Sequence, residues 1–329
     1  MKTTIPKKLS QGSTLQVIAP ARSLAIISDD TRHYADKHFK EILAINRVFG
    51  KHVDEIDEFN SSSIESRVSD LHAAYLDPDV DGLITVIGGY NSNQLLDSLD
   101  WDIIARNPKI ISGFSDITAI QNAIYAKTGV VTYSGPHYIN FGQKKFDPYT
   151  AEYFKRCVFS TGPYDIVPST YWTDDEWFLD QNNRKPMKND GYWSIQDGEG
   201  EGTIIGGNLC TLNLLQGTDY MPTANKVFLF VEDDGDTYAE LFDRDLESLL
   251  QIFKPGAIKA IVIGRFQQKS EMTLKTLTTI LKNKKQLAGI PVMANADFGH
   301  TDPKITFPIG GTARLTVKGA SVSLSIIEH

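Results

Sequence analysis

The sequence predicts an α/β fold, with a parallel sheet in the first half of the chain and a strand-rich second half. In the first half, short apolar runs alternate with longer segments of helical period, as in βαβ units. Near the C-terminus, apolar and polar side chains alternate over 313–317 and again over 322–326, which predicts an antiparallel hairpin.

The first half divides into strands and helices by its turn and capping residues. Ile117, Ile120 and Ile124 recur at helical spacing, and Gly129 is a typical C-terminal stop. Gly50 is expected to end an earlier helix in the same way. The predicted elements are strands over 15–19, 82–87 and 109–113, and helices over 30–49, 63–76 and from about 114 to 129.

The second half begins after a stretch of different character. Residues 162–191 carry several tryptophans and tyrosines among polar residues and have little periodicity, which indicates an inter-domain loop. After this loop we expect strands over 202–205, 227–231, 260–263 and 291–294, and helices over 239–253 and 271–284. The predicted organisation is an N-terminal domain over 1–165, the loop over 166–190 and a C-terminal domain over 191–329.

The composition is that of a globular protein. The chain has 329 residues, 41% of them apolar, and a net charge of -8, which argues against a nucleic-acid polymer or an anionic membrane as its main partner. Two cysteines cannot form a disulfide framework. There is no apolar run of membrane-spanning length and no leader-like N-terminus, so we expect a soluble cytoplasmic protein.

One candidate nucleophile lies where a strand runs into a helix. A sharp strand-to-helix turn lifts a serine hydroxyl clear of the backbone and brings amide groups near a reacting carbonyl, and Ser115 follows Gly113 at such a turn. The usual motif has a second glycine two residues after the serine, but Ile117 stands there. The alternative is that Ser115 only caps the following helix.

Candidate partners lie at other strand ends. Gly89 ends a buried strand and could supply an oxyanion amide together with Asp116, or it could belong to an ordinary tight turn. Glu232 follows five apolar residues and could orient an imidazole, or it could be a solvated strand end within an acidic cluster. The candidate bases are His300, in a Gly/Asp/Pro-rich loop, and His137.

Other chemistries fit the sequence poorly. It has no phosphate-binding Walker motif, no dinucleotide-binding glycine motif and no His-Glu-x-x-His motif. Cys157 and Cys210 are too few for a cysteine-rich zinc site. Cys210 is a possible nucleophile, but its apolar neighbours favour a buried structural cysteine.

Several stretches, in their order along the chain, resemble the serine peptidase family that holds the murein L,D-carboxypeptidases and the microcin C self-immunity proteins. They cover nearly the whole chain, and together they are far more specific than any one alone. The stretches are Ile87-Gly-Gly-Tyr-Asn-Ser-Asn-Gln94, Ser112-Gly-Phe-Ser-Asp-Ile-Thr118, Tyr133-Ser-Gly-Pro-His137, Glu201-Gly-Thr203, Gly206-Gly-Asn-Leu-Cys-Thr211, Phe230-Val-Glu-Asp233, Asp297-Phe-Gly-His-Thr-Asp-Pro303 and Thr306-Phe-Pro-Ile-Gly310.

The resemblance implies a flavodoxin- or amidotransferase-like α/β domain followed by a β-rich α+β domain, with the active site at their junction. It assigns Ser115 as nucleophile, Glu232 as carboxylate and His300 as base. It assigns the amides of Gly89 and Asp116 to the oxyanion hole. The reaction so implied, hydrolysis of an amide through an acyl-enzyme, needs no metal and no cofactor.

Two features are closer to the immunity-protein branch: the Tyr-Asn-Ser-Asn-Gln run after Gly89 and the long aromatic loop. The resemblance implies a peptidyl- or aminoacyl-nucleotide substrate whose base stacks on Trp177 or, failing that, Trp172, with Asn208 as a further substrate contact. Both tryptophans could instead only pack the domain junction. The alternatives are a murein tetrapeptide L,D-carboxypeptidase and a non-catalytic two-lobed ligand-binding protein. A homodimer is expected from the family.

Overall fold

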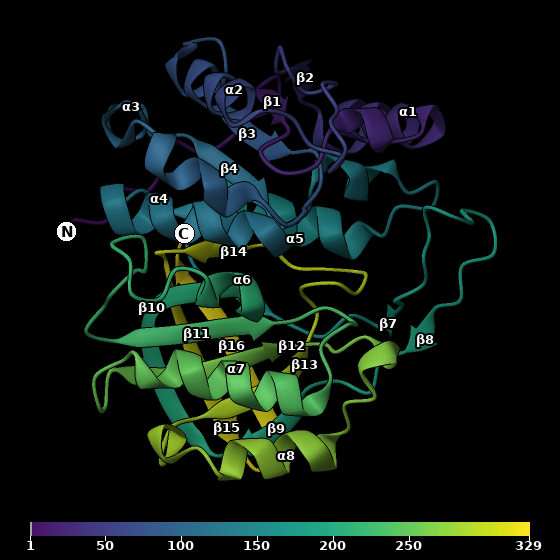
Figure 1. Cartoon of the computed structure of the whole chain (residues 1–329). Coiled ribbons are helices and arrows are strands. Elements are labelled where there is room, and N and C mark those ends of the chain that lie inside the picture. The colour runs from purple at the N-terminus through teal and green to yellow at the C-terminus, as the bar shows by residue number, and fades with distance from the viewer. Residues whose placement is uncertain (1) are drawn as a thin grey trace.

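The computed structural model describes residues 2–329, and its first sheet has six strands. Their order is β14-β5-β4-β3-β1-β2, and every neighbouring pair is parallel except β14 with β5. This sheet and its helices form the upper half of the molecule in Figure 1. The strands are β1 (Thr14–Ile18), β2 (Asn46–Phe49), β3 (Gly82–Thr85), β4 (Ile110–Gly113), β5 (Thr132–Ser134) and β14 (Phe307–Ile309).

Five α-helices accompany this sheet. Among them, α4 follows β4 after a short turn over 114–117 and ends at Gly129, which has a φ of 74°. It packs against β5 and also against elements of the second half of the chain, β10 and α6. The helices are α1 (Asp29–His38), α2 (Ile64–Leu76), α3 (Trp101–Arg106), α4 (Thr118–Thr128) and α5 (Pro148–Val158).

The second sheet has eight strands in the order β6-β16-β15-β10-β11-β12-β13-β9. Its middle, from β10 to β13, is parallel, while the outer pairs are antiparallel. The strands are β6 (Tyr164–Ile166), β9 (Trp193–Gln196), β10 (Gly198–Asn208), β11 (Val227–Glu232), β12 (Ile258–Gly264), β13 (Val292–Ala296), β15 (Thr312–Lys318) and β16 (Ser321–Glu328).

Helices α7 and α8 lie side by side over one face of this second sheet (Figure 1). Each connects two parallel strands, as the βαβ pattern requires. No helix within residues 2–329 is long and apolar enough to cross a bilayer. The helices are α6 (Leu209–Asn213), α7 (Ala239–Gln251) and α8 (Leu274–Lys282), and a small separate ribbon joins β7 (Tyr171–Trp172) to β8 (Met187–Lys188).

The expected single helix over 30–49 is wrong. The chain leaves the helix α1 through a π-helical turn over Phe39–Leu43, and Ala44 adopts a left-handed φ of 55°. It then forms β2, which pairs in parallel with β1 from Thr14↔Asn46 onward. Pairing with the edge of a distant strand therefore outweighs the local helical period.

The predicted fold class is confirmed: a parallel α/β sheet followed by a second, strand-rich sheet. The two halves are joined more closely than their order in the chain suggests. The β6 strand spans the predicted boundary at residue 165 and lies in the second sheet, whereas β14 returns to the first. One apolar cluster contains Tyr133 of the first sheet and Phe230 of the second, with Phe307 of β14 stacked on Phe230. The domain boundaries themselves stay a prediction.

Candidate active site

Ser115 lies on a strained turn between β4 and α4. Its φ is +59°, a left-handed conformation that a residue with a side chain adopts at some cost. The turn brings it against the end of β3: a β-carbon on Gly88 would lie 3.0 Å from Ser115 Cβ and 3.1 Å from its Oγ. The hydroxyl therefore stands at the carboxyl ends of two parallel strands, where open α/β sheets bind ligands.

His300 and Glu232 complete a hydrogen-bonded chain that begins at Ser115. The Nε2 of His300 is 3.0 Å from Ser115 Oγ, and its Nδ1 is 2.8 Å from Glu232 Oε2. Because the carboxylate only accepts, we assign the proton to Nδ1, which leaves Nε2 free to accept the hydrogen of the serine hydroxyl. The hydroxyl thus follows a strand of the first sheet, the carboxylate ends a strand of the second, and the imidazole comes from the loop that joins β13 of the second sheet to β14 of the first.

His300 can come this close to Glu232 only because a glycine lies beside the carboxylate. Glu232 is the last residue of β11 and is buried. Gly299 has a φ of +92°, and a β-carbon there would overlap the Glu232 carboxylate. The loop over 297–303, hereafter the His300 loop, can therefore fold directly over the carboxylate and place the imidazole between Glu232 and Ser115.

The charges around His300 favour its protonated form. Burial alone lowers the pKa of the imidazole, but the carboxylate of Glu232, its hydrogen bond and the nearby Asp234 and Asp233 outweigh this effect. The net result is that the pKa of His300 is raised above its usual value. The side chain is thus a stronger base than a free imidazole.

Asn208 lies under the carboxylate of Glu232. Its Nδ2 donates to Glu232 Oε1 at 3.3 Å and to Asp233 Oδ1 at 3.1 Å, while its Oδ1 caps the short helix α6 at Thr211. Burial, followed by the charge of Glu232, raises the pKa of Asp233 to about 7. Asn208 does not line the cavity described below, so its expected contact with substrate stays a prediction.

The two amides expected to bind an oxyanion, those of Gly89 and Asp116, belong to the two turns that meet at Ser115. Within residues 2–329 the N–H of Gly89 has no protein acceptor, and its role in binding an oxyanion stays a prediction. The two turns are tied together by Asp116, whose buried carboxylate accepts from the N–H groups of Asn91 at 3.1 Å and Ser92 at 2.9 Å. Sequence reasoning did not identify this role of the Asp116 side chain.

His137, the alternative base, lies close by but is not bonded to Ser115. Its Nδ1 is 2.6 Å from Thr85 Oγ1, and its ring packs on Phe114, which separates it from His300. Burial, followed by the positive charge of Lys304, holds the pKa of His137 well below its usual value. It is therefore a neutral, buried imidazole, and His300 is the histidine in contact with the candidate nucleophile.

A cavity of about 350 Å³ opens at Ser115 and His300. Trp177 lines it and is only 7% exposed, packed edge-on against Phe178. Trp172 does not line it, and the guanidinium of Arg265 lies over its ring at 4.8 Å. Of the two tryptophans that the sequence offered, Trp177 is therefore the one that lines this cavity, and its contact with substrate stays a prediction.

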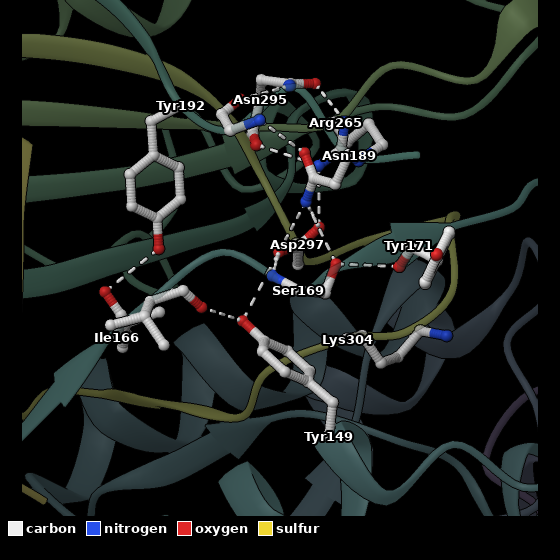
Figure 2. Close-up of polar contacts among 12 residues, drawn as sticks. Tyr149, Ile166, Ser169, Tyr171, Asn189, Tyr192, Arg265, Asn295, Asp297 and Lys304 are labelled. Atoms are coloured by element: carbon white, nitrogen blue, oxygen red, sulfur yellow. Dashed lines mark hydrogen bonds and ion pairs between the residues drawn. The ribbon is translucent and has the colours of Figure 1, made fainter. Parts of the chain in front are cut away.

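A buried polar network, drawn in Figure 2, joins the His300 loop to the aromatic segment over 166–190. Asp297, 1% exposed, forms an ion pair of 2.8 Å with Arg265, which is 3% exposed. The same carboxylate accepts from the backbone N–H of Ser169 at 2.8 Å and from the side chain of Asn189. The aromatic segment is thus fixed to the base of the loop that carries His300. Asp297 stood in a recognised sequence stretch, but nothing in the sequence indicated its partner.

The chain matches known proteins over nearly its whole length. A putative carboxypeptidase of Bacillus subtilis, YocD, is 49% identical over 98% of this chain and 99% of its own. The microcin C7 self-immunity protein MccF of Escherichia coli is 31% identical over 93% of this chain and 90% of its own. A crystal structure of an MccF-like protein from Bacillus anthracis superposes with a TM-score of 0.96 at 49% identity, covering 99% of this chain and 100% of that one.

Models of the LD-carboxypeptidase family match both halves: that of the N-terminal domain matches residues 15–135, and that of the C-terminal domain matches residues 201–315. The first match contains Ser115 and the second contains Glu232 and His300, the residues that the fold joins by hydrogen bonds. The chain therefore belongs to the LD-carboxypeptidase family, which also includes MccF.

Proposed function

We propose that the protein is a serine carboxypeptidase that hydrolyses the amide between an aminoacyl or peptidyl group and a nucleotide-like leaving group. The observation that carries the proposal is the continuous chain of hydrogen bonds from Ser115 through His300 to Glu232. Ser115 follows a strand of the first sheet, Glu232 ends a strand of the second, and His300 lies in the loop between the sheets. A structural role for Ser115 would not require an imidazole on its hydroxyl. The strain at Ser115 supports the same conclusion, since strain gathers at functional residues.

In the proposed reaction, Ser115 Oγ attacks the amide carbonyl while His300 Nε2 takes its proton and Glu232 stabilises the imidazolium. The carbonyl oxygen becomes an oxyanion between the N–H groups of Gly89 and Asp116. His300 then gives its proton to the nitrogen of the leaving group, and the C–N bond breaks to leave an acyl-Ser115 ester. A water molecule, deprotonated by His300, hydrolyses this ester and releases Ser115.

The nucleotide-like leaving group is proposed from the relatives and from the cavity. MccF has been solved in complex with aspartyl sulfamoyl adenosine, an aminoacyl-nucleoside analogue. In this chain the aromatic Trp177 lines the cavity beside His300, and stacking of a base on such a ring contributes roughly 1–3 kcal/mol. The other candidate, a murein tetrapeptide, follows from a relative named murein tetrapeptide carboxypeptidase.

A panel assay tests the proposal. The purified protein is incubated with aspartyl sulfamoyl adenosine and with a murein tetrapeptide, and the products are separated by chromatography. We expect cleavage of the nucleoside analogue, and its loss by roughly three powers of ten or more in Ser115→Ala. Ser98→Ala, an exposed serine away from the cavity, is the matched control and should retain full activity.

Three other outcomes of the panel assay would change or overturn the proposal. Cleavage of the tetrapeptide alone would replace the nucleotide-like substrate with a murein peptide. Binding of either ligand without turnover would favour a two-lobed binding protein. Full turnover by Ser115→Ala would overturn the serine mechanism itself.

A further inference from the structure

Asp233 is a buried acid that directly follows Glu232, and the proposed reaction gives it no part. The residue is 1% exposed. Its Oδ1 accepts from the Nδ2 of Asn208 and from the backbone N–H of Asp234, each at 3.1 Å. Its Oδ2 is buried and has no hydrogen-bond partner among residues 2–329. Because buried polar atoms are nearly always paired, this second oxygen is unusual.

Asn208 joins Asp233 to the hydrogen-bonded chain that begins at Ser115. The Oδ1 of Asn208 accepts from the backbone N–H of Thr211 at 3.1 Å and from its hydroxyl at 2.9 Å, so the Nδ2 must face the two carboxylates. That Nδ2 is 3.1 Å from Asp233 Oδ1 and 3.3 Å from Glu232 Oε1. Because the contact with Asp233 is the shorter one, Asp233 helps to decide where the amide lies when it donates to Glu232.

The surroundings of Asp233 disfavour a second negative charge beside Glu232. The titratable groups that act on it or on which it acts are the carboxylates of Glu232 and Asp234, the thiol of Cys210 and the imidazole of His300. No lysine or arginine among residues 2–329 offers it a positive charge. Burial, followed by the charge of Glu232, therefore raises the pKa of Asp233 to about 7.

A proton on the Oδ2 of Asp233 agrees with both the hydrogen bonds and the charges. The Oδ1 accepts two N–H groups and acts as the carbonyl oxygen of an acid, so the proton belongs on the unpartnered Oδ2. A buried hydroxyl without an acceptor costs far less free energy than a buried charge without a partner. In this form Asp233 holds Asn208 and adds no charge beside Glu232.

We propose that Asp233 is a positioning residue for the proposed reaction: as a neutral acid, it holds the amide of Asn208 against the carboxylate of Glu232. Glu232 in turn orients His300. The inference rests on the proposed function and adds to it a residue that touches neither the substrate nor the reacting atoms. When Asp233 loses its proton, its charge raises the pKa of His300, so more of the imidazole stays protonated and unable to act as a base.

Two substitutions of Asp233 separate its hydrogen bond from its charge. Asp233→Asn keeps an oxygen that accepts from Asn208 but cannot ionise, so its kcat should stay near that of wild type. Asp233→Ala removes this oxygen and should lower kcat about tenfold with little change in KM, the effect of one lost hydrogen bond that positions a catalytic group. Asp102→Asn makes the same chemical change at an exposed carboxylate on α3 and is the matched control.

The pH profile of kcat/KM gives a readout that a merely structural role would not move. In wild type, Asp233 ionises over the range in which His300 loses its proton, and each ionisation opposes the other. The acidic limb should therefore be shallower than the titration of a single group. In Asp233→Asn the limb should have the slope of one group and a midpoint at lower pH, whereas Asp102→Asn should keep the wild-type profile.

An NMR titration tests the inference without any substrate. In protein labelled with ¹³C at the aspartate carboxyl carbons, the resonance lost in Asp233→Asn belongs to Asp233, and it should titrate near pH 7. The ring of His300, assigned through His300→Gln, should have a lower pKa in Asp233→Asn than in wild type. Thermal melts of each variant verify that the fold is intact.

Three results overturn the inference: an Asp233 carboxyl that titrates at the usual aspartate pKa of about 3.9, a His300 ring whose pKa is the same in Asp233→Asn, or equal losses of kcat in Asp233→Asn and Asp233→Ala. If wild type hydrolyses neither compound of the panel assay, the proposed function fails, and the two titrations alone decide whether Asp233 is a neutral acid that acts on His300.

Discussion

Replacing Asp297 with alanine tests how the His300 loop and the aromatic segment over 166–190 are held together (Figure 2). Asp297 and Arg265 are 1% and 3% exposed, so their ion pair is removed from water. Without the carboxylate, Arg265 is left as an unpaired buried charge, and the N–H of Ser169 loses its acceptor. Breaking a buried pair from one side costs roughly 3–5 kcal/mol.

That loss of unfolding free energy corresponds to a decrease in the melting temperature, Tm. An unfolding entropy of about 2.1 cal/mol/K per residue gives roughly 0.7 kcal/mol/K for a chain of 329 residues. A loss of roughly 3–5 kcal/mol therefore lowers Tm by about 4–7 °C. The His300 loop begins at Asp297, so the folded variant should also have a lower kcat.

Differential scanning calorimetry and urea unfolding measure these changes. The matched control is Glu201→Ala, which removes one partner of the ion pair with Arg314, where both side chains are about half exposed. Such surface pairs contribute about 0–1 kcal/mol, so this variant should melt near wild type and keep its kcat.

The reasoning is refuted if Asp297→Ala and Glu201→Ala destabilise the protein equally. A double variant sharpens the test: Arg265→Ala, Asp297→Ala should lose less than the sum of the two single variants, because it leaves no unpaired charge. Strict additivity would mean that the two side chains do not act as a pair.

Two further predictions concern His300 and Ser115, the proposed base and nucleophile. Because His300 must be neutral to act as a base and its pKa is raised, kcat/KM should fall on the acidic side around a midpoint above the usual imidazole value of about 6.5. Asp234→Asn removes one of the charges responsible and should move that midpoint to lower pH; an unmoved midpoint contradicts the electrostatic account. Ser115→Gly should relieve the strain of φ +59° and stabilise the protein by about 1 kcal/mol in urea unfolding, at the expense of activity. Ser115→Ala keeps the strain and is the comparison, so equal stabilities of the two variants would contradict the prediction.

The sequence predicted those elements whose own residues determine their type and their ends. Gly129 ends α4, and the alternation over 313–317 and 322–326 becomes the antiparallel pair β15 and β16. It failed where a distant partner decides the structure. Residues 46–49 form β2 because they pair with the edge of β1. No pattern within these residues indicates that this edge is there.

The residues of the candidate site also fall into two groups, those that the sequence indicated and those that only the fold reveals. Ser115, Glu232 and His300 were first singled out because each follows a predicted strand, and the family resemblance joined them; the fold brings them together. The ion pair of Asp297 with Arg265 and the hydrogen bonds that Asp116 accepts from Asn91 and Ser92 were not identified, since each depends on partners that only the fold brings close. Such relations exist only after folding.

The strand β14 has a consequence for how the chain is made. It completes the first sheet by pairing with β5, yet it lies at residues 307–309 of 329. During synthesis, the half that carries Ser115 is therefore exposed with an unpaired strand edge until nearly the whole chain has left the ribosome. The nascent N-terminal half cannot complete its sheet ahead of the rest, so Ser115 and His300 reach their final places almost together.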